Sequence, residues 1–205
     1  MNKIYIVLIV VIFIISIAYN IYFKYKQKKL NAYVLKALLE KNYSKFDSVI
    51  NTKVAKKYIP QFNLNFLKFN SYILRDDKNQ ADSIFDSSIT KKMTNQQKLS
   101  FYSRAISYYI GINDKKRSKK CYDVILSIKG YDKEKLYLKM LYDVMVLNDI
   151  SYQKEIEKKI DNDDDQEKAV DYHLLAHIYK VEKDDVQFQK YETASKELVQ
   201  KINSK

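Results

Sequence analysis

The sequence predicts an all-α protein with a single N-terminal transmembrane helix, followed by an α-solenoid of about five helical hairpins. Three observations predict this fold class. An uncharged apolar run opens the chain, apolar residues then recur at helical spacing almost to its end, and short polar turns interrupt them at a regular interval. The chain also has only 2 glycines and 1 proline. All-β and Rossmann-type folds need many glycine turns, so this composition disfavours both.

The first predicted element is the apolar run from Ile4 to Phe23, which holds 20 residues and no charge. As a helix that rises about 1.5 Å per residue, it would span the roughly 30 Å hydrocarbon core of a bilayer. It is apolar on all sides, so it has no polar face to lie on a membrane surface. Tyr5, Tyr19, Tyr22 and Tyr25 stand near its ends, where aromatic belts form. We therefore expect residues 4–23 to cross a lipid bilayer.

A cleaved signal peptide is the alternative for this run. Ser16 and Ala18 place small residues in an A-x-A-like arrangement before Tyr19. The apolar run continues beyond that point, which favours an uncleaved anchor. Cleavage after Ala18 stays open at this stage.

The charges on either side of the run predict its orientation. Lys24, Lys26, Lys28 and Lys29 follow it directly, whereas only Lys3 precedes it. The positive-inside rule therefore places the rest of the chain in the cytoplasm of a bacterial cell. The opposite, extracytoplasmic orientation stays open, because one lysine before the run can suffice. The four lysines are expected at the membrane surface, where anionic lipid attracts each by about 1 kcal/mol.

The basic charge is concentrated in the first part of the chain. Residues 24–60 hold 10 basic and 2 acidic side chains, residues 61–130 hold 13 and 6, and residues 131–205 hold 13 and 17. We divide the chain into an anchor (1–23), a basic juxtamembrane segment (24–34) and a repeat domain (35–205).

The repeat domain is predicted from the spacing of its turns. Polar breaks fall near Asn42, Asp77, Asn113, Asp149 and Asp184, at intervals of 35, 36, 36 and 35 residues. Such a period is typical of a helical-hairpin solenoid, in which each unit buries its apolar face by stacking on the next. An irregular all-helical domain with accidental spacing is the alternative.

Small and aromatic residues recur within these units. The clearest set is Tyr72, Ala81, Phe85 and Ser88; Ala105, Tyr108, Tyr122 and Ile125 follow in the middle unit, and Ala176, Tyr179, Tyr191 and Ala194 in the last. In these residues the chain resembles the tetratricopeptide-repeat family. The resemblance implies that small residues let the two helices of a hairpin approach, while most aromatic side chains fill the core.

The resemblance further implies a concave groove that binds a protein or peptide. Helix positions flanking the small residue would face this groove. They are Tyr102, Ile106 and Tyr109 in the middle unit, and His173, His177 and Lys180 in the last.

No pattern in the sequence indicates a catalytic or metal site. His173 and His177 have a spacing that can bind zinc, but the glutamate of the metalloprotease motif is missing and no third ligand is evident. The run Asp163–Asp165 lacks the spaced ligands of a calcium loop, and Cys121 has the setting of an ordinary buried thiol. The basic run of residues 115–120 occurs without a nucleic-acid-binding fold, so we interpret it as a solvated helix face.

These observations predict a membrane-anchored scaffold or adaptor that binds a protein or peptide partner, without catalysis. No cofactor, metal or nucleic acid is expected. The alternative is an extracytoplasmic envelope or chaperone-like factor held by an uncleaved signal sequence.

Overall fold

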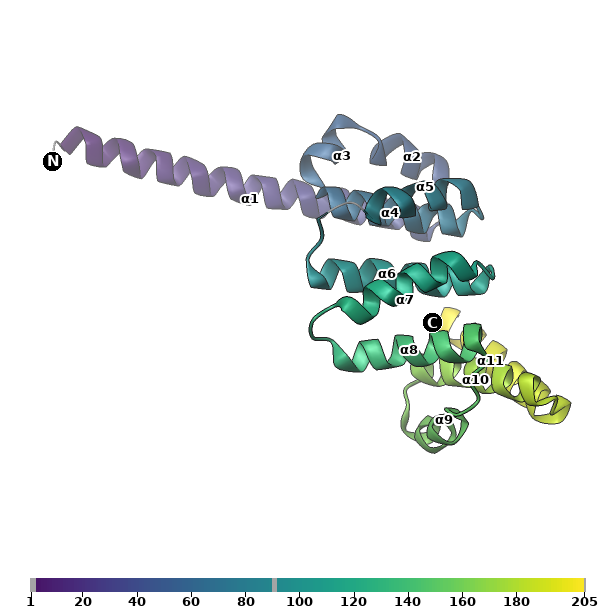
Figure 1. Cartoon of the computed structure of the whole chain (residues 1–205). Helices are drawn as coiled ribbons and strands as arrows, with labels where there is room; N and C mark the ends of the chain where they lie inside the picture. The colour runs from purple at the N-terminus through teal and green to yellow at the C-terminus, as the bar shows by residue number, and fades with distance from the viewer. Residues whose placement is uncertain (1–2, 90–91, 205) are drawn as a thin grey trace. The chain divides into compact units, whose positions relative to one another are not determined.

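The computed structural model of the chain describes residues 3–89 and 92–204, without the side chains of residues 3–12, 14, 89 and 203. The described part contains eleven α-helices and one short 3-10 helix, and no strand (Figure 1). The all-α part of the predicted fold class is therefore confirmed. The chain divides into two compact units, Met1–Met93 and Thr94–Lys205.

The predicted transmembrane helix is wrong. Among the described residues, no helix is both long and apolar enough to cross a membrane. The side chains of residues 4–12 and 14 lie outside the described part.

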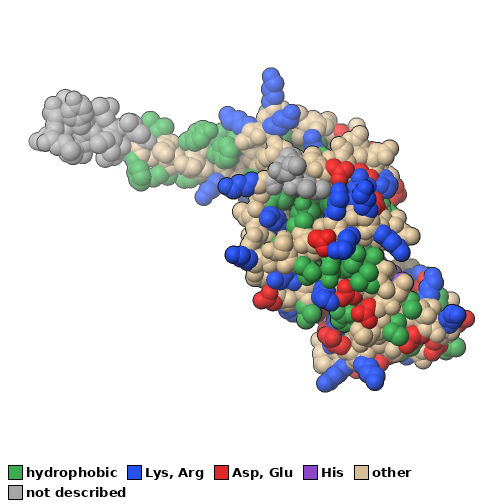
Figure 2. Space-filling model, viewed as in Figure 1, with side chains coloured by type: hydrophobic (Ala, Val, Ile, Leu, Met, Phe, Trp, Pro, Cys, Tyr) green, Lys and Arg blue, Asp and Glu red, His purple; other side chains and the backbone are tan. Residues whose placement is uncertain are grey.

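The first unit begins with α1 (Lys3–Leu39), a single continuous helix. The predicted domain boundaries after residues 23 and 34, and the candidate cleavage point after Ala18, therefore all lie inside one helix. Hydrophobic side chains between residues 13 and 25 are exposed along it, as Figure 2 shows in green. The helices that follow are α2 (Tyr43–Ile50), α3 (Lys53–Tyr58), α4 (Gln61–Leu74) and α5 (Lys78–Ile89).

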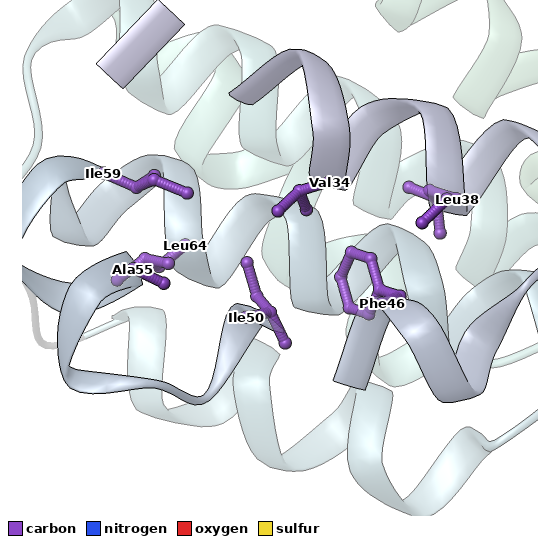
Figure 3. Close-up of a cluster of buried hydrophobic side chains, with 8 residues drawn as sticks. Val34, Leu38, Phe46, Ile50, Ala55, Ile59 and Leu64 are labelled. Carbon is purple, nitrogen blue, oxygen red and sulfur yellow. The ribbon is translucent and has the colours of Figure 1, made fainter. Parts of the chain in front are cut away.

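The last turns of α1 contribute to the core of the first unit. Their buried side chains meet those of α2, α3 and the start of α4 (Figure 3). Each side chain of this cluster is at most 5% exposed, so it supplies the apolar burial that holds the unit together. The labelled members are Val34, Leu38, Phe46, Ile50, Ala55, Ile59 and Leu64.

The second unit is built from three successive helical pairs. Helix α6 packs against α7, α8 is followed by the short α9 and η1, and α10 packs against α11 (Figure 1). The bounds are α6 (Asn95–Gly111), α7 (Lys115–Ser127), α8 (Asp132–Leu147), α9 (Gln153–Lys159), η1 (Ile160–Asn162), α10 (Asp165–Glu182) and α11 (Asp185–Asn203).

A left-handed residue marks the turn of every hairpin among the described residues. Within two residues of its end, the first helix of each pair is followed by a residue with positive φ: Lys41, Asp76, Asn113, Asn148 or Lys183. A left-handed residue at this point lets the following N–H bond back to the last helical carbonyls. The Asp114 N–H, for example, donates to the Tyr109 carbonyl at 2.8 Å. The fourth turn is one residue longer, since the Asp149 N–H donates to Asp143.

The side-chain oxygen of the residue after each left-handed position accepts a hydrogen bond from a backbone N–H two or three residues later, at 2.9 to 3.1 Å. In four turns this bond caps the next helix, at Asn42, Asp77, Asp114 and Asp184. These caps satisfy donors that the first turn of a helix leaves without a partner. In the fourth turn the Asp149 bond lies within the turn itself, because α9 begins only at Gln153. The predicted positions of the five turns are confirmed.

Small residues lie where the helices of a pair approach. Ala81 and Ala105 have no exposed surface, and Ala176 is 4% exposed. Aromatic rings connect successive pairs, since Tyr122 of α7 stacks on Tyr142 of α8 with ring centroids 4.3 Å apart. Most of these aromatic side chains therefore serve packing rather than recognition.

Candidate binding pocket in the second unit

An open pocket of about 710 Å³ lies in the second unit, lined mainly by α8, α9 and α10. Each helix contributes residues at helical spacing, which places them on one face. Helix α8 supplies Lys133, Tyr137 and Met140, and α10 supplies Gln166 and Val170. The pocket thus forms where three helices from two successive pairs converge.

The lining combines apolar and charged side chains. Leu136, Tyr137, Met140 and Val170 supply apolar surface. The charged side chains are Lys133, Glu134, Glu155, Lys159, Asp163 and Glu167. A pocket with apolar walls and a few convergent polar groups is the usual form of a binding site.

A buried polar cluster lies at one end of the pocket. The ammonium nitrogen of Lys159 is 2.6 Å from Oδ2 of Asp171 and 3.5 Å from Oδ2 of Asp163. Asp171 has no exposed surface, whereas Lys159 and Asp163 line the pocket. Asp171 therefore cannot touch a ligand itself, but it positions the two side chains that can.

The two aspartates of this cluster differ in acidity. Burial, and then the neighbouring Asp163, raise the pKa of Asp171 to about 7 despite the opposing effect of Lys159. The carboxyl group of Asp171 lowers the pKa of Asp163, and Lys159 lowers it further. The aspartate that lines the pocket is therefore the more acidic of the two.

Tyr137 remains neutral beside this cluster. Burial, followed by the negative charges of Asp171 and Glu167, raises its pKa to about 12. Its ring therefore offers the pocket an uncharged aromatic surface.

A second polar network includes Tyr152, which also lines the pocket. The ammonium group of Lys139 lies 2.5 Å from Asp143 Oδ2 and 3.0 Å from the Tyr152 hydroxyl. The same hydroxyl donates to Asp143 at 2.9 Å. Asp143 is buried, so these bonds hold the Tyr152 ring in one orientation at the pocket wall.

None of the six predicted groove residues lines this pocket. Tyr102, Ile106 and Tyr109 are buried in α6, at 4%, 0% and 0% exposure. A peptide could reach these side chains only after they moved. Their role in a groove stays a prediction.

The other three predicted groove residues share one face of α10. His173 and Lys180 are exposed, and His177 Nε2 lies 2.9 Å from Asn148 Oδ1. Burial, then the nearby His173 and Lys180, lower the pKa of His177. The structure therefore brings these three together, and their contact with a peptide also stays a prediction.

Of the remaining residues singled out in the sequence, Asp163 lines the pocket, whereas Cys121 and residues 115–120 do not. Among the described residues, no group of three His, Cys, Asp or Glu side chains is arranged to hold a metal ion. Cys121 is buried, which raises its pKa and keeps it a thiol. In the basic run of residues 115–120, Lys119 pairs with Asp123, and Arg117 lies 3.1 Å from Asp114.

The four lysines predicted at a membrane surface, Lys24, Lys26, Lys28 and Lys29, are exposed on α1. The ammonium group of Lys26 lies 5.5 Å from the centre of the Tyr22 ring.

Sequence reasoning missed the Lys159, Asp163 and Asp171 cluster. One signal was available, because Asp171 stands in the apolar stripe of α10, between the buried Ala169 and Leu174. An acidic residue within such a stripe indicates a buried partner.

The described residues define an all-helical, solenoid-like protein with a pocket formed by consecutive helical pairs. Comparison of the chain with models of protein families, with characterised proteins and with solved structures found no match.

Proposed function

We propose that this protein is a helical-repeat scaffold that binds a protein or peptide partner through the pocket of its second unit, without catalysis. The observation that carries the proposal is the pocket itself, whose walls come from α8, α9 and α10. Stacked helical pairs present extended binding surfaces of this kind. The resemblance of the turns and small residues to tetratricopeptide repeats supports the same proposal.

The polar groups at the pocket support recognition rather than bond chemistry. Asp163 and Asp171 lie beside the same lysine, Lys159, as a pair of catalytic carboxyl groups could, but Asp171 is fully buried behind the lining. A catalytic acid and base must both come within hydrogen-bond reach of the reacting atoms. Only Asp163 meets that condition, because only Asp163 lines the pocket. The role we assign to the pair is therefore to set the charge of the pocket wall.

Filling the pocket tests the proposal. Val170→Trp places a bulky side chain in the lining, and Val181→Trp, on the same helix but outside the lining, is the matched control. Affinity purification from the native cells should recover a partner with the wild type and with Val181→Trp, and lose it with Val170→Trp. Thermal unfolding checks that each variant is folded. Leu136→Trp, at a 56% exposed lining position, provides a second variant that cannot disturb the core.

The proposal fails if the pocket-filled variants recover the same proteins in the same amounts as the wild type. It also fails if no protein is enriched by the wild type over a variant that carries both Val170→Trp and Leu136→Trp.

A further inference from the structure

We infer that the pocket receives a basic side chain, Lys or Arg, of the partner peptide. This inference rests on the proposed function, because it names the chemistry of the bound segment. It is carried by the charges of the lining and by the aromatic and aliphatic surface beside them.

The carboxylates of the pocket outnumber its ammonium groups. Four acidic side chains line it against two lysines. Glu134, Glu155 and Glu167 form no ion pair with any described residue. The pocket therefore has net negative charge, to which a cation is complementary.

One of the two lysines already has carboxyl partners. The Lys159 ammonium group is held at 2.6 Å by the buried Asp171 and at 3.5 Å by Asp163. These two carboxyl groups balance the positive charge of Lys159, so that charge does not offset the negative charges of the three glutamates. Lys133 is the remaining positive charge, and it is exposed.

The apolar part of the lining suits the stem of a long basic side chain. Leu136, Met140 and Val170 can cover the methylene chain of such a side chain. In proteins, the stems of Lys and Arg commonly lie along apolar surface while their charged groups stay in a polar environment. The neutral ring of Tyr137 provides a face that attracts cations, and the Tyr152 ring already has such a contact, with the Lys139 ammonium group 5.7 Å from its centroid.

Other side chains fit this lining less well. An acidic side chain would meet the repulsion of the glutamates. A purely apolar one would remove water from these carboxylates without replacing its hydrogen bonds. A basic side chain avoids both costs, and Arg gains the additional option of bidentate pairing.

Synthetic peptide pools test this inference on the full chain. The probes are acetylated and amidated heptapeptide pools, with the central residue fixed as Lys, Arg, norleucine or Glu. The other positions hold an equal mixture of Ala, Leu, Ser and Tyr. Binding is followed by NMR of methyl-labelled methionine, since Met140 lines the pocket and Met145, on the same helix, lies outside the lining.

The Lys and Arg pools should shift the Met140 signal and bind about tenfold more tightly than the norleucine pool, because only a basic side chain can form a charge-assisted hydrogen bond with a carboxylate of the pocket. In the double variant Glu155→Gln with Glu167→Gln, this preference should fall to about twofold or less. The matched control, Glu182→Gln with Glu197→Gln, changes two exposed glutamates outside the lining and should retain the full preference.

Equal affinity of the norleucine and Lys pools, tighter binding of the Glu pool, or no Met140 shift with any pool would overturn the inference. Equal affinity with a Met140 shift would leave the proposed function standing, because the pocket would still bind peptide. Failure of the proposed function is detected separately, by the purification with Val170→Trp.

Discussion

The ammonium group of Lys159 lies 2.6 Å from the carboxyl group of Asp171, a side chain with no exposed surface. Lys159 also lines the pocket, so this ion pair connects the interior of the second unit to its candidate binding surface. Two predictions follow from the burial of its acidic member.

Lys159→Met should destabilise the second unit by about 1–3 kcal/mol at pH 8, because it leaves a buried carboxyl group without its cation. The loss should be smaller at pH 5.5, where Asp171 is protonated and needs no cation. Urea unfolding at the two pH values measures the difference. Lys158→Met, at the exposed neighbouring position, should have little effect at either pH. An equal loss at both pH values would contradict the assigned role of Asp171.

Asp171→Asn should remove a pH dependence of stability. The pKa of Asp171 is about 7 in the folded protein, against an ordinary value near 4. The folded state therefore holds a proton that the unfolded chain has lost between about pH 4 and pH 7, so the free energy of unfolding falls as the pH rises through this range. The groups that face Asp171 are Lys159, Asp163, Tyr137 and Glu167.

Urea unfolding at pH 5, 6, 7 and 8 tests this slope. The asparagine variant should show a flatter profile than the wild type, and Asp161→Asn, an exposed neighbour, should retain the wild-type profile. Parallel profiles of the wild type and Asp171→Asn would show that Asp171 titrates normally.

Asp184→Ala should destabilise the last hairpin by about 1 kcal/mol, because the side chain caps α11 through the Gln187 N–H at 3.1 Å. Asp185→Ala removes an adjacent exposed carboxylate that makes no cap, and should cost about 0.5 kcal/mol or less. Thermal unfolding compares the two variants. If Asp185→Ala cost as much as Asp184→Ala, the capping role of Asp184 would be wrong.

Phe46→Ala should destabilise the first unit by about 3–5 kcal/mol, since Phe46 is 1% exposed in its core. Leu39→Ala, at a position 74% exposed, is the control and should cost less than about 0.5 kcal/mol. Amide hydrogen exchange locates the effect. Loss of protection should fall within residues 3–89, and unchanged protection there would contradict the described core.

The turns could be predicted from the sequence because their chemistry is local. An Asn or Asp side chain caps the next helix through atoms two or three residues away, so its position in the chain suffices to locate Asn42 or Asp184. The pocket could not be predicted in this way. It depends on Tyr137 and Lys159 meeting across different helices.

Two further expectations rested on patterns that the sequence alone cannot resolve. Periodicity shows which residues share a helix face but not how deeply a neighbouring helix covers that face. Ile106 and Tyr109 are fully covered, and their role in a groove stays a prediction. Apolar composition alone predicted the membrane-spanning helix, which the described part of the chain does not contain.

The most direct test of the binding pocket is site-specific photo-crosslinking in the native cells. A photoreactive phenylalanine derivative replaces Leu136, which lines the pocket and is 56% exposed, or Val186, which lies outside the lining and is 77% exposed. We expect one discrete protein adduct from position 136. This adduct should be absent from position 186, and it should be lost when Val170→Trp fills the pocket. The same adducts from both positions, or an adduct from position 136 that persists with Val170→Trp, would contradict it.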